Sequence, residues 1–232
     1  MQTVRQSDER GVANFGWLDS RHTFSFGHYH DTRFMGFGPL RVINEDHVKP
    51  ARGFDTHGHR DMEIITYVVS GALRHEDSLG NSSVMRPGDV QRMTAGSGVR
   101  HSEYNASDNE DVHLLQIWIE PEVLNLPPGY EQKVFTDEQR TNQLRLVVAR
   151  DGRDGAVSIH RDADIYAGLL EPGVTLQHAF TAARSGWLQV VHGELRANDL
   201  TLRSGDGVAL RDVPTLQLHA VAATELLLFD MG

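Results

Sequence analysis

Two short motifs, His57-Gly58-His59 and His101-Ser102-Glu103, combine the residue types and the spacing of a metal site. Both lie in segments predicted to be β-strands, where side chains at positions i and i+2 point to the same face. Each motif can therefore direct two ligands at one point. If the two strands are neighbours, three imidazoles and one carboxylate converge. That donor set suits a divalent first-row metal such as iron, copper, nickel or zinc.

The coordination preference of the ion determines what such a site can do. Four protein ligands close a tetrahedral zinc site, which is then structural. An ion that prefers five or six ligands, as iron often does, keeps positions open for water, oxygen or a substrate oxygen. The motifs thus allow either a structural or a catalytic centre.

Other residues compete for these roles. Glu63 has the strand parity of His57 and His59, so it is the alternative carboxylate ligand. The pair His28-Tyr29-His30 has the same His-x-His spacing, but it lies in a stretch rich in Phe and Gly and is interpreted as a surface or pocket-wall pair. His75 is interpreted as an exposed strand residue in preference to a support for a metal ligand.

The elements that must position these residues are predicted to be short strands. Apolar or alternating runs separated by turn residues dominate the chain, and the clearest are 63–69, 114–119, 187–191 and 225–229. Gly80-Asn81 predicts a hairpin turn. Gln116 and Trp118 lie within the second run and are expected in the core. One short helix is expected over 137–142, and no long segment has convincing helical periodicity.

A weak internal repeat relates the two halves of the chain. The segment 68–73 (VVSGAL) resembles 190–195 (VVHGEL), which lies 122 positions later, and RPGD at 86–89 resembles RSGD at 203–206, 117 positions later. A repeat at this spacing predicts a duplicated β domain. The run Leu126-Pro127-Pro128-Gly129 is the natural linker, so we expect domains over 1–128 and 129–232.

The repeat also predicts that only the first domain holds a metal. By these offsets, the counterparts of the four motif residues are Ala179, Thr181, Leu218 and Ala220. His178 and His219 lie one position away from such counterparts. A slip of one residue on a strand turns a side chain to the other face. The second domain is therefore expected to lack metal ligands.

The net charge and the cysteine content of the chain argue against several classes of function. The formal net charge is −10 and there is no cysteine. The acidic balance argues against nucleic-acid binding, which usually needs a basic surface, and the missing cysteines exclude disulfides, thiolate metal sites and cysteine nucleophiles. The sequence contains no run of 18 apolar residues, so no membrane-spanning helix is expected. We expect a cytoplasmic protein that binds neither membranes nor nucleic acids.

These residues carry a family resemblance. The segment 53–63 (GFDTHGHRDME) resembles the first cupin motif, and 87–89 (PGD) with 98–105 (GVRHSEYN) resembles the second. The stretches 75–81 (HEDSLGN) and 93–98 (MTAGSG) are similar to the pirin family in particular. The resemblance is specific over residues 15–120 and diffuse beyond them.

The resemblance implies an all-β bicupin, with two tandem jelly-roll-type cupin barrels and few short helices. It further implies that the N-terminal barrel binds one divalent transition metal ion. Its expected ligands are His57, His59, His101 and Glu103. Fe²⁺ is the expected ion, with Zn²⁺, Cu²⁺, Ni²⁺, Co²⁺ or Mn²⁺ as alternatives.

The same resemblance implies an enzyme. Bacterial pirin-like proteins similar to this chain have quercetin 2,3-dioxygenase activity, which opens the central ring of a flavonol with O₂ and releases CO. Glu103 is the candidate base for the flavonol 3-hydroxyl, and apolar walls are needed for a flat substrate. The aromatic residues expected to supply them are Phe24, Phe26, Phe34 and Phe37.

Two other functions are consistent with the same barrel. One is a non-catalytic, metal-containing regulatory module that binds other proteins, as pirins that act as transcription cofactors do. The other is a small-molecule isomerase or decarboxylase, since a fold does not determine the chemistry it supports. A monomer is expected in each case, with a small aromatic substrate and O₂ as the partners of the enzyme.

Overall fold

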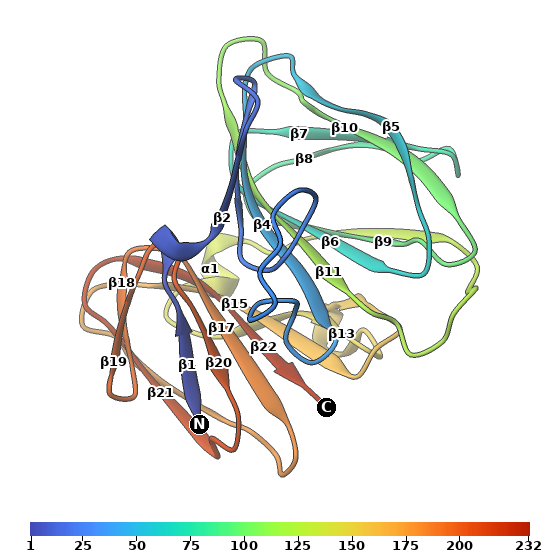
Figure 1. The fold of residues 1–232 in the computed structure, drawn as a ribbon. Helices are drawn as coiled ribbons and strands as arrows, with labels where there is room; N and C mark the ends of the chain where they lie inside the picture. Colours follow the sequence, from blue (N-terminus) through green and yellow to red (C-terminus); the bar gives the residue numbers. More distant parts are fainter. The chain divides into compact units, whose positions relative to one another are not determined.

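The computed structural model describes residues 1–232 and consists almost entirely of β-strands (Figure 1). Contacts divide the chain into two compact units. The N-terminal unit comprises 11–134 and 157–161, and the C-terminal unit comprises 1–10, 135–156 and 162–232. The all-β prediction is confirmed.

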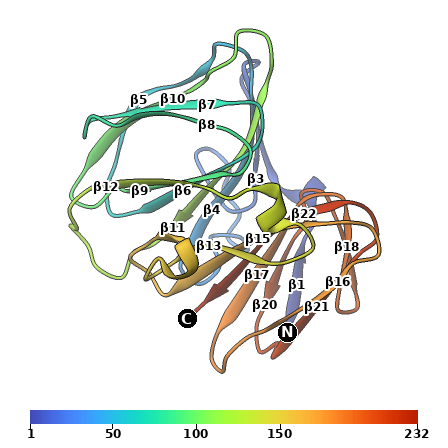
Figure 2. The same ribbon diagram turned by 180° about the vertical axis from the view of Figure 1, so that it is seen from behind.

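The N-terminal unit contains a seven-stranded sheet, in the order β12-β9-β6-β11-β4-β3-β2, and a four-stranded sheet, in the order β5-β10-β7-β8. The two sheets face each other, as both ribbon views show (Figures 1 and 2). Its strands are β2 (Gly11–Asn14), β3 (Leu18–His22), β4 (Leu40–Val48), β5 (Gly53–His59), β6 (Glu63–Ser70), β7 (Leu73–Asp77), β8 (Ser82–Met85), β9 (Asp89–Thr94), β10 (Val99–Asn105), β11 (Val112–Ile119), β12 (Gly129–Val134) and β14 (Val157–Ser158).

The C-terminal unit repeats this plan. Its larger sheet includes the strands β1-β20-β17-β22-β15-β13 in that order, and its four-stranded sheet has the order β16-β21-β18-β19. Its strands are β1 (Gln2–Arg5), β13 (Arg145–Ala149), β15 (Ala163–Leu170), β16 (Thr175–Ala179), β17 (Ser185–His192), β18 (Glu194–Ala197), β19 (Leu200–Arg203), β20 (Gly207–Leu210), β21 (Thr215–Ala220) and β22 (Thr224–Met231).

Helices are few and short, as predicted. The only α-helix is α1 (Asp137–Arg140), and two 3₁₀ turns cover Ser7–Glu9 and Arg153–Gly155. A capping box between Thr136 and Gln139 begins α1. No helix has the length and apolar composition needed to cross a membrane.

The four apolar runs of the sequence form the central strands. In the N-terminal unit they are β6 and β11, which pair antiparallel, and in the C-terminal unit they are β17 and β22, which pair in the same way. Most residues of these strands are buried on both faces. Continuous apolar sequence, with no polar alternation, is what two covered faces require.

The repeated glycines occupy the same turn in both units. Gly71 follows β6 with φ 78°, and Gly193 follows β17 with φ 96°. A Cβ atom at Gly71 would lie 2.6 Å from the carbonyl oxygen of Asp111, and one at Gly193 would lie 2.2 Å from that of Ala223. Positive φ and close backbone approach together require glycine, which explains why the repeat survives here.

The division into units differs from the boundary expected after residue 128. Residues 1–10 belong to the C-terminal unit because β1 pairs with β20, and β12 belongs to the N-terminal unit because it pairs with β9. β9 of the N-terminal unit thus gains β12 as an outer partner, and its counterpart β20 gains β1. β1 is separated from the rest of the C-terminal unit by more than a hundred residues of sequence, so local sequence did not reveal that it belongs there.

The interior of the C-terminal unit is filled by a cluster of buried apolar side chains. Leu218 and Ala220, at the positions that correspond to His101 and Glu103, belong to this cluster. His178 lies against Asp230, with Nε2 2.8 Å from Oδ2, and His219 contacts the hydroxyl of Thr175. Apolar packing therefore occupies the place that the metal motifs occupy in the first unit.

The carboxylate of Asp230 is expected to make the folding stability of the C-terminal unit depend on pH. Burial alone would raise the pKa of Asp230, but hydrogen bonds from His178 and Arg184 outweigh it and lower the pKa. A carboxylate with a lowered folded-state pKa stabilises the fold above its unfolded pKa of about 4, and the contribution is lost as pH falls further. We expect Asp230→Asn to cost about 2 kcal/mol at pH 7. Denaturant unfolding of the metal-free proteins at pH 7 and pH 3 should show this difference shrinking, and an equal difference at both pH values would contradict it.

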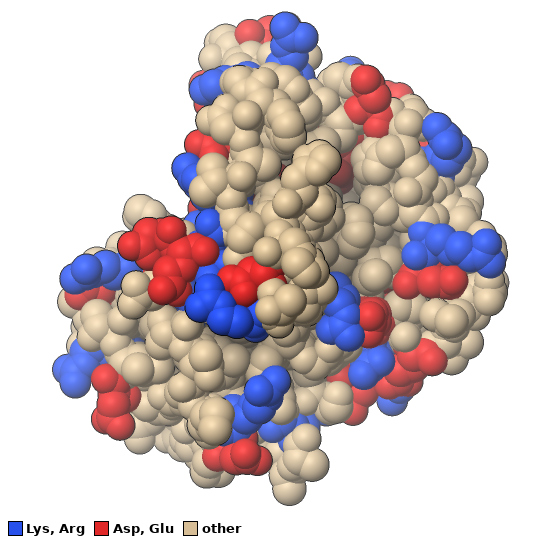
Figure 3. Space-filling view, viewed as in Figure 1, with Lys and Arg blue, Asp and Glu red and all other residues tan.

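Charged side chains are interspersed on the face shown in Figure 3. Lys and Arg alternate there with Asp and Glu, and no continuous basic tract is visible. A phosphate backbone is bound by such a tract, so that face does not resemble a nucleic-acid surface.

Candidate metal centre

Two adjacent strands bring the predicted histidines together. β5 and β10 pair antiparallel, with His57 directly opposite His101 and His59 opposite Val99. The Nε2 atom of His101 lies 3.0 Å from Nε2 of His59 and 3.1 Å from Nε2 of His57. The expected convergence of the three imidazoles is confirmed in this geometry.

The spacing of these nitrogens fits a transition-metal ion. With metal–nitrogen bonds of about 2.0–2.1 Å, ligands at right angles lie about 3.0 Å apart, and ligands at tetrahedral angles lie about 3.4 Å apart. The separations of 3.0 and 3.1 Å from Nε2 of His101 are close to these values. These three residues would hold such an ion through neutral imidazole nitrogens.

A β-bulge in β5 shapes the site. Between His101 and Glu103 of β10 the register shifts, so that Glu103 pairs with Phe54 and one extra residue lies in β5. Phe54 and His57 are three positions apart, yet both line the same cavity. In a regular strand they would face opposite sides, and a bulge is the usual way to redirect a side chain.

Glu103 follows His101 on β10 and is buried at 3% exposure. Its carboxylate accepts a hydrogen bond of 2.9 Å from Nε2 of Gln116 and a longer one, of 3.4 Å, from the hydroxyl of Thr66. A ligand oxygen of Glu103 lies within 4.8 Å of ring nitrogens of His101 and His75. The structure therefore places Glu103 beside the histidines, held by two polar neighbours.

Gln116 is buried and Trp118 packs against a cluster of buried apolar side chains, as expected for core residues, but the two also have a place in the site. Both line the cavity on the inner face of β11. Gln116 orients Glu103, and the ring of Trp118 packs edge-on against His59 with centroids 5.0 Å apart. Alternation along the strand distinguished two faces, but only the paired sheet identified the face that borders the cavity.

Glu63, the alternative carboxylate, is engaged elsewhere. It is fully buried on β6, where Oε2 accepts a 2.9 Å hydrogen bond from Thr94 and Oε1 lies 3.1 Å from Nδ1 of His160. It does not line the cavity that contains the three histidines. Strand parity alone could not separate it from Glu103, because the chain turns between β5 and β6.

His75 is buried, in contrast to the exposed position expected for it. Its Nδ1 lies 3.4 Å from Nδ1 of His101, and its Nε2 lies 3.3 Å from Oδ2 of Asp77. If Nε2–H of His75 donates to Asp77, its Nδ1 accepts from Nδ1–H of His101. The Nε2 lone pair of His101 is then free for a metal, as it is when a carboxylate–histidine pair supports a ligand. The tautomer of His57 is fixed in the same way. Its Nδ1–H donates to the carbonyl oxygen of Asp55 at 2.7 Å, which leaves the Nε2 lone pair available.

We expect His75→Ala to weaken metal binding by about 10–100-fold, because partners of this kind orient the ligand and raise its basicity. Competition with a chromogenic chelator would measure the affinity. Thermal unfolding would detect a packing defect, and His75→Gln, which keeps polar atoms in the gap, should lose less. His192→Ala, an exposed histidine of the C-terminal unit, is the matched control. An unchanged affinity in His75→Ala would exclude the supporting role.

Burial favours the neutral form of two of these histidines. Desolvation, together with the neighbouring imidazoles, lowers the pKa of His59 to about 4 and that of His101 to about 3. A neutral imidazole is the form that binds a metal. The site is therefore prepared for an ion at neutral pH without loss of protons from these rings.

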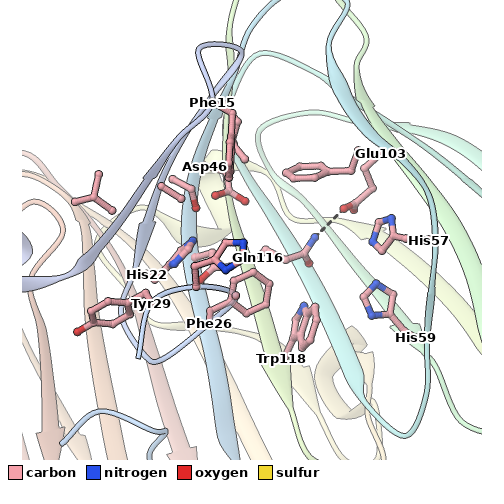
Figure 4. Close-up of a pocket in the computed structure, with 18 of the residues that line it drawn as sticks. Phe15, His22, Phe26, Tyr29, Asp46, His57, His59, Glu103, Gln116 and Trp118 are labelled. Carbon is pink, nitrogen blue, oxygen red and sulfur yellow. Dashed lines mark hydrogen bonds between the residues drawn. The ribbon is translucent and has the colours of Figure 1, made fainter. Parts of the chain in front are cut away.

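The histidines form one wall of a cavity of about 440 Å³. His57, His59 and Glu103 lie on one side, and His22, Tyr29 and Asp46 lie on the other (Figure 4). Apolar and aromatic groups complete the lining, namely Val12, Phe15, Leu18, Phe26, Phe54 and Trp118. A cavity of this size with mostly apolar walls suits a small aromatic ligand.

Of the aromatic residues expected to line the site, only Phe26 does so. Phe24 and Phe37 are buried away from the cavity lining, and Phe34 does not border it either. His28 lies at the cavity wall, in agreement with its interpretation as a pocket-wall residue. The other aromatic walls come from Phe15 and Tyr29 nearby and from Phe54 and Trp118 on distant strands.

The far wall contains polar residues that the sequence analysis did not single out. Ser20 on β3 and Asn44 and Asp46 on β4 line the cavity. Burial raises the pKa of Asp46 to about 7, against a hydrogen bond with Ser20 that lowers it, and the charge of Glu103 raises it further. The alternate positions of Asn44 and Asp46 on β4 were the available signal. Glu45 and His47, which alternate with them, are also polar, so the sequence did not identify the inner face.

A second cluster of metal-binding residue types, Glu45, His47 and His113, lies on the outer face of the sheet. Glu45 and His47 alternate along β4 with the residues that line the cavity, so they point away from it. The rings of His47 and His113 stack with centroids 4.0 Å apart and an angle of 17°, and His113 contacts Glu45 at 3.0 Å. Lone pairs of stacked rings run side by side and do not converge on one ion.

Comparison with known proteins matches both parts of the chain to known families. The family described as pirin matches residues 3–119, and the family described as the quercetinase C-terminal cupin domain matches residues 146–231. A protein of Escherichia coli K12 named quercetin 2,3-dioxygenase is 46% identical over 98% of this chain and 97% of its own length. A pirin-like protein of Caulobacter vibrioides is 39% identical over 96% of both chains.

Solved structures agree with this placement. The bacterial pirin YhhW from Escherichia coli, in complex with nickel(II), has a TM-score of 0.95 and 45% identity, and the match covers 100% of this chain and 99% of that one. The tandem-cupin architecture expected from the sequence is confirmed, and a His/Glu metal-binding site of the expected kind is present. The chain belongs to the pirin family.

Proposed function

We propose that this protein is a metal-dependent dioxygenase that opens the central ring of flavonols such as quercetin with O₂ and releases CO. The observation that carries the proposal is the convergence of three imidazoles and a buried carboxylate at the wall of an apolar cavity. The relative from Escherichia coli named quercetin 2,3-dioxygenase, identical at 46% of positions, supports the same chemistry.

We further propose that His57, His59, His101 and Glu103 hold one divalent ion, with Fe²⁺ first among the candidates. The Nε2 atoms of His57 and His59 both lie close to that of His101, and imidazoles together with a carboxylate are typical of non-haem iron. When bound, such an ion lowers the pKa of the flavonol 3-hydroxyl and activates the resulting flavonolate toward O₂.

The residues of the chain supply position and proton transfer. Glu103 is proposed to accept the proton of the 3-hydroxyl, and Gln116 holds the carboxylate in place through its 2.9 Å hydrogen bond. Phe54 and Trp118 border the histidines and can contact the flat faces of the substrate. Together these walls limit access of water to the reacting groups.

The decisive experiment is a turnover assay in which the metal is varied. Metal-free protein is reloaded separately with Fe²⁺, Cu²⁺, Ni²⁺, Co²⁺, Mn²⁺ or Zn²⁺, and O₂ uptake and CO release are followed with quercetin. We expect about one ion per chain, from the single set of ligands, and turnover with one or more of the redox-active ions. If the protein binds one ion yet converts quercetin with none of them, the enzyme proposal fails and a regulatory metal-binding module takes its place.

We also propose that the protein acts in the cytoplasm as a monomer. The absence of cysteine supports a reducing compartment. Light scattering of the metal-loaded protein should give the mass of one chain, 25.9 kDa.

A further inference from the structure

The wall opposite the histidines contains buried polar atoms that the proposed reaction does not use. Asn44 and Asp46 are 4% and 5% exposed, and both line the cavity. Oδ1 of Asn44 and Oδ1 of Asp46 have no hydrogen-bond partner in the protein, and neither has Nε1 of Trp118 on β11. Buried polar atoms are costly when unpaired and are rarely retained without a purpose.

The two acceptors act from one face of one strand. Asn44 and Asp46 are two positions apart on β4, so their side chains project to the same side. Ser20, opposite Asp46 on β3, is hydrogen-bonded to Asp46 and holds that carboxyl in place. The acceptor pair is therefore positioned by paired strands and not by a loop.

The chemistry of these atoms defines the ligand they complement. Two neighbouring acceptors require hydroxyl or N–H donors, and the indole N–H of Trp118 requires an acceptor such as a carbonyl or ether oxygen. The remaining lining is largely aromatic and aliphatic. A flat aromatic molecule with hydroxyl groups on a ring remote from the metal offers this combination.

We propose that Asn44 and Asp46 form a hydroxyl-recognition subsite, which binds adjacent hydroxyl groups on the phenyl ring of the flavonol while its 3-oxygen faces His57, His59 and His101. This inference rests on the proposed function for the identity of the ligand. Figure 4 shows Asp46 on the opposite side of the view from His57 and His59, and all three line the same cavity. The subsite would make the protein selective for flavonols with a dihydroxylated phenyl ring.

The test measures binding without turnover. Titration calorimetry on the metal-loaded protein under argon compares quercetin, which has two phenyl hydroxyls, with kaempferol, which has one, and galangin, which has none. All three share the reacting ring and its 3-hydroxyl. We expect affinity to fall in that order, by about 10-fold for each hydroxyl lost, the loss typical of a hydrogen bond to a buried or charged partner.

Two variants assign the preference to the subsite. Asn44→Leu and Asp46→Leu should each reduce the quercetin-to-galangin affinity ratio by about 10-fold, and the double variant should nearly abolish it. Asp46→Asn, which keeps the shape of the side chain, guards against a folding defect, and metal content and thermal unfolding are checked for each protein. Asp108→Leu, at an exposed loop position, is the matched control.

The outcomes are separable. If the wild-type protein binds the three flavonols equally, or if the variants weaken quercetin and galangin by the same factor, the subsite is overturned. If no flavonol binds, it is overturned as well. If binding follows the expected order under argon but admission of O₂ gives no CO, the subsite stands and the dioxygenase proposal fails.

Discussion

His101→Ala should abolish both metal retention and flavonol turnover. His101 is the central residue of the proposed ligand set, since its Nε2 lies 3.0 and 3.1 Å from the corresponding atoms of His59 and His57. Partners that merely support a ligand are worth about 10–100-fold in metal affinity, so a direct ligand should cost more than about 100-fold. Metal analysis after gel filtration and O₂ uptake with quercetin measure the two losses.

Controls separate ligand loss from unfolding. His101 is buried among other rings, so His57→Ala, at a less buried position of β5, serves as a second variant with the same expected result. His30→Ala removes an exposed histidine and should retain the wild-type metal content. Full metal content in both ligand variants would show that these imidazoles do not form the centre.

Glu103→Gln should retain much of the bound metal and lose turnover by about 10²–10⁴-fold, the range for removal of a general base. The substitution keeps the size of the side chain and removes its charge and basicity. Gln116 can still donate to the remaining carbonyl oxygen, so the local packing is preserved. The rate is compared at saturating metal, because a weakened ligand would otherwise be mistaken for a missing base.

Two matched variants sharpen this experiment. Glu63→Gln alters the alternative carboxylate, and it should leave metal content unchanged because Glu63 is hydrogen-bonded to Thr94 and lies beside His160. Glu110→Gln, at an exposed position, should have no effect on turnover. Undiminished turnover in Glu103→Gln would refute its role as the base.

Much of the site was predictable from local patterns. The i and i+2 spacing of His57 with His59 and of His101 with Glu103 required only that each motif form a strand, and the apolar runs located the central strands. The repeat around Gly71 and Gly193 predicted two similar units. These features depend on neighbours within a few residues, where backbone geometry leaves few alternatives.

The surroundings of the ligands were not predictable in this way. The bulge that brings Phe54 beside His57, the burial of His75 behind His101, and the inward direction of Trp118 all depend on which strands pair and in what register. A shift of one residue in pairing exchanges the two faces of a strand. Sequence periodicity alone cannot show which of the two faces borders a cavity.

The sequence by itself therefore predicted the all-β character, the duplication and the grouping of the three histidines. The tertiary structure placed Glu103 in the cavity and Glu63 against Thr94, joined β1 to the C-terminal unit, and placed Asn44 and Asp46 opposite the histidines. The physical reason is that motif spacing is fixed by the geometry of one strand. A cavity wall is made by side chains from several strands, whose pairing is decided by contacts between distant segments.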